Sequence, residues 1–170
     1  MSNAIALDPD TYYNQWTPAD GADDKKLAKL FLDDVIENNK RRVDDWSARV
    51  DSALSEIRAE CSVDGWDGED GAAITEATRE LSRKVVTLLH AATPAGTPPP
   101  ELVPESDGEL ALSWTRTPDL VFSVSIGAHG FLNYAGTLSE GVEAHDVARF
   151  ISGDKTAIEK LAALLKQLYK

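Results

Sequence analysis

The stretch that decides how this chain is organised reads Asp64-Gly65-Trp66-Asp67-Gly68-Glu69-Asp70-Gly71. Before it the sequence has the apolar period of a helix, and after it comes a second helical pattern followed by short strand-like runs. Glycine permits the backbone conformations of tight turns, and a large aromatic ring is seldom left in water. We therefore expect a corner in which Gly65, Gly68 and Gly71 turn the chain and a buried Trp66 joins two layers.

The 170 residues have 42% hydrophobic side chains, a single cysteine and a formal net charge of −12. This length fits about one domain, whose core needs no disulfide or structural metal. A lone cysteine, Cys61, cannot form an internal disulfide. No stretch has the pattern of a signal peptide, and no apolar run approaches the ~20 residues of a membrane span. These features predict a cytoplasmic protein that does not cross a membrane.

Residues 1–22 form an irregular segment in which aromatic and acidic side chains occur beside prolines. Such rings either fold back onto the domain or form an exposed anchor for a partner, since aromatic residues are enriched at binding hot spots. The candidate partner-binding residues of this region and of the helix start that follows are Tyr12, Tyr13, Trp16, Asp20, Asp23 and Asp24.

Residues 23–62 give the strongest helical signal and form a helical arm with a long apolar stripe. Part of the stripe recurs every seven residues, at Ile36, Val43, Val50 and Ile57. One helix of this length spans roughly 55 Å, whereas a compact chain of this size is about 40 Å across. The arm is therefore either a helical hairpin that breaks near Asn38-Asn39 or a long helix whose residues 27–61 offer a homodimer interface.

Residues 63–170 are predicted to form an α+β domain. Thr75 and Glu76 favour a helix start, which predicts a helix over 76–92 that the proline-rich stretch 93–100 ends. The buried face of this helix is expected to hold Ala77, Leu81, Val85, Leu88 and Ala92.

Period-two alternation after the prolines predicts an antiparallel β-meander of three or four strands. The strands are expected at 101–104, 110–114, 120–126 and 131–135, with a short addition at 147–151. A last amphipathic helix, capped by Asp154, follows them. The fold class is thus α+β: an N-terminal long helix or helical hairpin, a central helix packed on the meander, and a C-terminal amphipathic helix.

The corner and the strands after it resemble a group of small bacterial proteins in which a W-D-G-x-(G/x)-A-like corner precedes a helix, a proline-rich break and a meander. Here the corner is Trp66-Asp67-Gly68-Glu69-Asp70-Gly71-Ala72, and the meander ends in a Tyr-Ala-Gly-like turn, Tyr134-Ala135-Gly136. The likeness spans about Gly65 to Phe150, and this chain inserts Glu69-Asp70 before Gly71-Ala72. The resemblance implies an architecture and no established activity.

Four corner carboxylates, Asp64, Asp67, Glu69 and Asp70, are ligands of the kind that hard cations prefer. Their spacing does not fit an EF-hand loop, and acidic residues are also favourable just before a helix N-terminus. We expect a turn here rather than a metal site, so no metal or cofactor is assigned. A metal-dependent hydrolase built on these four residues is the third functional hypothesis.

Three histidines and one cysteine are the remaining candidates for catalysis. His145-Asp146 is the single adjacent His–acid pair, and a carboxylate that orients an imidazole can support general-base catalysis. No G-x-S-x-G motif accompanies the pair, and Cys61 falls at a helical core position. His90 is placed in the last turn of a helix and His129 in a hairpin turn. We therefore assign no catalytic residue and predict that the protein is not an enzyme.

Charge is unevenly distributed: residues 1–24 and 60–80 are acidic, and residues 25–42 are locally basic. A negative field repels nucleic acid and steers association toward basic partners. The leading hypothesis is a non-enzymatic acidic interaction protein, an inhibitor or neutralising protein of the phage anti-defence or antitoxin/immunity type. It would bind a basic, nucleic-acid-handling protein through the N-terminal candidates and the corner carboxylates. The alternative is a homodimeric structural module built on the long helix.

Overall fold

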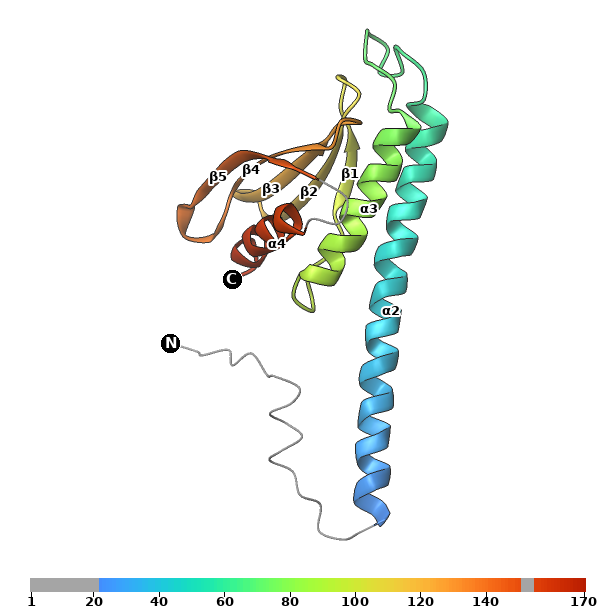
Figure 1. Cartoon of the computed structure of the whole chain (residues 1–170), viewed down its shortest axis with the longest axis vertical. Coiled ribbons are helices and arrows are strands. Elements are labelled where there is room, and N and C mark those ends of the chain that lie inside the picture. The colour runs from blue at the N-terminus through green and yellow to red at the C-terminus, as the bar shows by residue number, and fades with distance from the viewer. Residues whose placement is uncertain (1–21, 151–154) are drawn as a thin grey trace. The chain divides into compact units, whose positions relative to one another are not determined.

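The computed structural model describes residues 22–150 and 155–170, except for the side chains of residues 22–27 and 38–45. The chain divides into two compact units, residues 1–42 and 43–170, and helix α2 contributes residues to both. The elements are α2 (Ala22–Glu60), α3 (Glu76–Ala92), β1 (Glu101–Pro104), β2 (Leu110–Thr117), β3 (Leu120–Ile126), β4 (Phe131–Thr137), the 3₁₀ turn η1 (Ser139–Gly141), β5 (Glu143–Arg149) and α4 (Thr156–Leu168) (Figure 1). In these ranges no helix combines the length and apolarity needed to cross a membrane.

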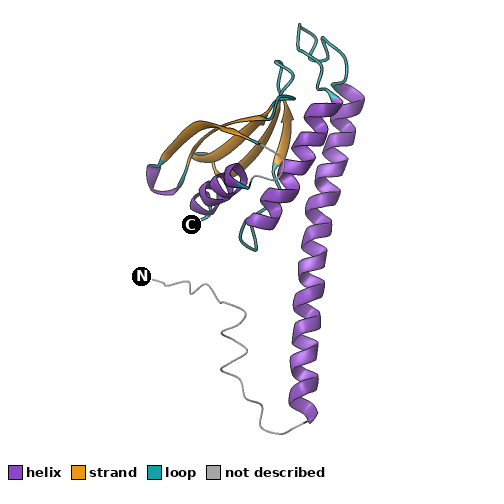
Figure 2. Ribbon diagram, in the orientation of Figure 1, coloured by secondary structure: helices purple, strands orange, loops and turns teal. Residues whose placement is uncertain are grey.

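The α+β class is confirmed, but the sheet has five strands rather than three or four. Each strand pairs antiparallel with the next, in the order β1-β2-β3-β4-β5 (Figure 2). The fifth strand is β5, which covers 143–149, whereas the sequence predicted a short strand at 147–151. Edge strands commonly carry charged side chains, so Glu143, Asp146 and Arg149 hide the period that would have revealed it.

One face of the sheet is apolar and lies against α3 and α4 (Figure 1). The register aligns Leu112, Val124 and Tyr134 in one row across three strands. These side chains are buried in the same core cluster as Leu161 and Leu165 of α4. Each fully buried aliphatic side chain of this kind contributes ~1.5–3 kcal/mol, which makes this layer the main source of stability.

Helix α3 has the predicted bounds and the predicted cap, because Thr75 Oγ1 accepts a hydrogen bond from the Thr78 N–H at 3.1 Å. Its predicted buried face is correct in part: Val85 is buried and Leu81 and Leu88 are partly buried against the core, whereas Ala77 and Ala92 are exposed. The helix contacts the sheet and α4 on one side and the second part of α2 on another, so the buried sector is rotated. The buried residues are Thr78, Arg79, Ser82, Val85, Val86 and Leu89.

Helix α2 is a single element from Ala22 to Glu60, so the predicted hairpin with a break near Asn38-Asn39 is not formed. The later part of its apolar stripe is buried in the core of the second unit, at Trp46, Val50, Leu54, Ile57 and Cys61. The prediction of a dimer interface over 27–61 is therefore wrong for these residues, because they already pack within the chain.

Two buried tryptophans hold the proline-rich connector. Trp46 Nε1 donates to the Thr97 carbonyl at 3.2 Å, and Trp114 Nε1 donates to the Pro98 carbonyl at 3.1 Å. The sequence analysis predicted this layer-joining role for Trp66, which is only half-buried. Its indole N–H donates within its own loop, to the carbonyl six residues on, at 3.0 Å. Trp46 and Trp114 therefore join distant segments of the chain, whereas the indole N–H of Trp66 bonds only within its own loop.

Helix α4 buries the four predicted side chains, Ile158, Leu161, Leu165 and Leu168. The predicted cap, Asp154, lies outside the described residues, and Lys155 at the N-cap position makes no side-chain capping bond. An ion pair between β5 and α4 joins Asp146 Oδ2 to Lys160 Nζ at 2.8 Å.

Gly136 was expected in a turn and instead lies inside β4, opposite Phe122 of β3 and Ala144 of β5. A Cβ at this position would lie 2.8 Å from Phe122 Cα and would also collide with the Val121 carbonyl oxygen. Glycine is needed here so that β3 and the Phe122 ring can approach β4 closely.

Gly136→Ala should lower the free energy of unfolding by about 1–3 kcal/mol, because the added methyl group overpacks this contact. Urea unfolding followed by tryptophan fluorescence measures the change. Ala135→Ser, at the exposed neighbouring position, is the control and should change stability by less than about 0.5 kcal/mol. An unaltered unfolding midpoint for Gly136→Ala would contradict the close approach.

The Asp146–Lys160 pair should make stability depend on pH. The hydrogen bond from Lys160, with help from the Val147 N–H, lowers the pKa of Asp146, and the same bond raises the pKa of Lys160. The stabilisation is fully present above the ordinary aspartate pKa of 3.8 and is lost as the pH falls through the lowered value. On the alkaline side it is lost as the pH rises through the raised pKa of Lys160.

Asp146→Asn should therefore lower the thermal unfolding midpoint near pH 7 and change it little near about pH 2, where both chains lack the carboxylate. Thermal melts of the two proteins across this pH range provide the measurement. Asp119→Asn removes another exposed acidic group and serves as the control. A destabilisation that is the same at both pH values would show that the ion pair is not its cause.

Candidate functional site

The loop between α2 and α3 is closed by its own backbone. The Ile74 N–H donates to the Cys61 carbonyl at 2.8 Å, and the Gly65 N–H donates to the Gly71 carbonyl at 2.7 Å. Gly65 and Gly68 have φ values of +76° and +87°, which L side chains rarely adopt. The loop therefore has a fixed shape that depends on glycine at these two positions.

Two of the predicted site carboxylates stabilise this loop. Asp64 Oδ1 accepts the Ala73 N–H at 2.9 Å. Asp67 Oδ1 accepts the N–H groups of Glu69 and Gly71, at 3.0 Å and 3.1 Å. These are local side-chain-to-backbone bonds of the kind that organise turns. The geometry therefore assigns Asp64 and Asp67 to turn formation, and this does not favour the hydrolase hypothesis.

The loop lies beside the turn that joins β1 to β2 (Figure 1). The Ala72 N–H donates to the Ser106 carbonyl at 2.7 Å. Gly108 has a φ of +85°, and a Cβ there would lie 3.3 Å from the Ala73 carbonyl oxygen. Glycine thus allows two segments that are distant in sequence to come into backbone contact.

The β1–β2 turn adds three carboxylates that sequence reasoning missed, those of Glu105, Asp107 and Glu109. One oxygen from each lies within 4.8 Å of the others. The Ser125 hydroxyl contacts the carboxylates of Glu105 and, at 2.5 Å, Glu109, and Asp107 Oδ1 accepts the Glu109 N–H at 3.0 Å. Such oxygens could hold a hard cation, but here they already have partners in the protein. In the sequence, the alternating Glu-x-Asp-x-Glu pattern between two predicted strands could have indicated this cluster.

Together the two segments form an acidic end of the second unit. It consists of Asp64, Asp67, Glu69, Asp70, Glu105, Asp107 and Glu109. All are exposed except Glu105 and Glu109, which are half-buried. No Lys or Arg occurs between Arg58 and Arg79 or between Lys84 and Arg116 in the sequence.

Arg79, the first basic residue after the loop, points into the protein. Arg79 is buried, and its guanidinium donates to the Ile74 carbonyl and to Glu76 Oε2, the latter at 2.6 Å. This hydrogen bond, followed by the positive charge of Arg79, lowers the pKa of Glu76. Arg79 therefore neutralises Glu76 and contributes little positive charge at the acidic end.

The predicted N-terminal part of the site lies outside the described residues. This applies to Tyr12, Tyr13, Trp16 and Asp20, and also to the side chains of Asp23 and Asp24. The structure therefore brings the four corner acids together with the β1–β2 turn, and it gives no placement for the aromatic candidates.

The candidates for catalysis are separated or used in packing. His145 pairs with Ala135 and Asp146 with Tyr134, so the two neighbours lie on opposite faces of β5. The His90 ring packs against Trp46, with 4.6 Å between ring centroids. Burial raises the pKa of the Cys61 thiol, which keeps it in the weakly nucleophilic protonated form.

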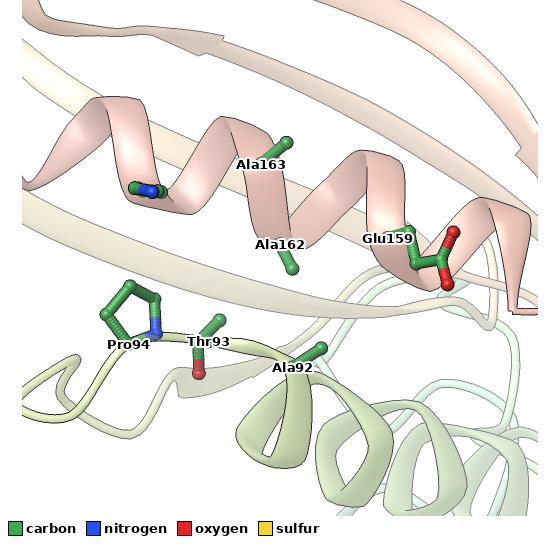
Figure 3. Close-up of a pocket in the computed structure, with 7 residues that line it drawn as sticks. Ala92, Thr93, Pro94, Glu159, Ala162 and Ala163 are labelled. Atoms are coloured by element: carbon green, nitrogen blue, oxygen red, sulfur yellow. The ribbon is translucent and has the colours of Figure 1, made fainter. Parts of the chain in front are cut away.

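A shallow pocket of about 360 Å³ lies between the end of α3 and α4 (Figure 3). Its lining includes Ala92, Ala162 and Ala163, with Glu159 and Lys166 as the charged groups. Ligand sites combine an apolar wall with several convergent polar groups, and this lining does not provide them. The acidic end is thus the stronger candidate site.

No protein-family profile, no curated protein and no solved structure matches this chain.

Asp67→Ala should lower the free energy of unfolding by about 1–2 kcal/mol, because two loop N–H groups lose their acceptor. Urea denaturation gives the value directly. Asp70→Ala, three residues away, removes a carboxylate with no hydrogen-bond partner among the described residues and should leave stability within about 0.5 kcal/mol. Equal effects of the two substitutions would argue against the turn-forming role of Asp67.

Proposed function

We propose that this chain is an interaction protein that binds a basic surface of another protein through its acidic end. It inhibits or neutralises that partner by occupying the surface rather than by making or breaking bonds. The observation that carries the proposal is the contact of two loops that together contribute seven carboxylates and no Lys or Arg.

Preorganisation supports this function. Asp64, Asp67 and Asp107 bond to backbone N–H groups of their own turns, so the loops have little conformational freedom left to lose on binding. Glu69 and Asp70 are exposed, and within the described residues their carboxylates accept no hydrogen bond. The site therefore offers both a fixed frame and carboxylates that can reach a partner.

Electrostatics favour a partner whose surface carries several Lys or Arg residues. Opposite unit charges about 4 Å apart attract by ~1 kcal/mol in bulk water and by several times more where water is excluded. Complementary fields also accelerate association and disfavour partners of the wrong charge. Proteins that contact the phosphates of nucleic acids carry such basic surfaces, so a nucleic-acid-handling protein is the class of partner we propose.

The test compares two variants with equal losses of charge. Glu69→Gln/Asp70→Asn removes two carboxylates from the acidic end, whereas Asp119→Asn/Glu140→Gln removes two from the β2–β3 and β4–β5 connections. A basic protein captured by the tagged wild-type chain from native-host extract is purified, and its affinity for each chain is measured by calorimetry at increasing salt. We expect the first variant to bind at least about 10-fold more weakly and the second to bind like the wild type.

Binding should also weaken as salt rises, because exposed charges are screened beyond a Debye length of about 8 Å at physiological ionic strength. Equal affinity of the two variants, or an affinity that does not change with salt, would overturn the assignment of the acidic end as the binding site.

A further inference from the structure

We draw no further inference here: the strongest candidate, the pocket of about 110 Å³ between α2 and α3 that Arg58, Arg79 and Arg83 line, carries no ligand assignment because carboxylates of this chain already face these cations, with Glu76 paired to Arg79 at 2.6 Å and Asp51 to Arg83 at 3.0 Å.

Discussion

Burial of one apolar sheet face under α3 and α4 is the constraint on which the second unit depends. Side chains alternate between the two faces of a strand, so fixing Leu112, Val124 and Tyr134 inward fixes the direction of every neighbour. The same alternation sends Asp146 toward α4 and His145 to the opposite face. Packing of the sheet therefore separates the His145 and Asp146 side chains, which the sequence suggested as a catalytic pair. Asp146 instead forms an ion pair that joins β5 to α4.

The acidic end is a consequence of the same packing. Once the sheet lies on the helices, the β1–β2 turn meets the α2–α3 loop, and Gly108 permits a backbone contact that a larger residue would obstruct. Gathering carboxylates of like charge opposes the folded state. Hydrogen bonds from turn N–H groups and from Ser125 offset part of that cost. This arrangement is consistent with the binding of a positively charged partner that we propose.

The apolar side chains of helix α2 differ in burial along its length. Its side chains from Trp46 to Cys61 complete the core of the second unit, whereas those from Leu30 to Ile36 remain exposed to solvent. Periodicity gives both parts the same appearance in the sequence. Only the tertiary structure shows that the two parts differ in exposure.

The sequence by itself determined the features that local chemistry controls: the α+β class, helix α3 with its Thr75 cap, strands β1 and β3, the buried face of α4 and the glycine-rich loop. Tertiary structure decided the rest. In the structure Trp46 and Trp114, rather than Trp66, hydrogen-bond to the proline-rich connector. Gly136 lies in strand β4, whereas the sequence predicted a turn there. Tertiary structure also set the bounds of the charged edge strand β5 and joined Glu105, Asp107 and Glu109 to the corner acids. The physical reason is that capping, turns and period depend on neighbours in sequence, whereas a shared charged surface and a close strand approach depend on residues that only packing brings together.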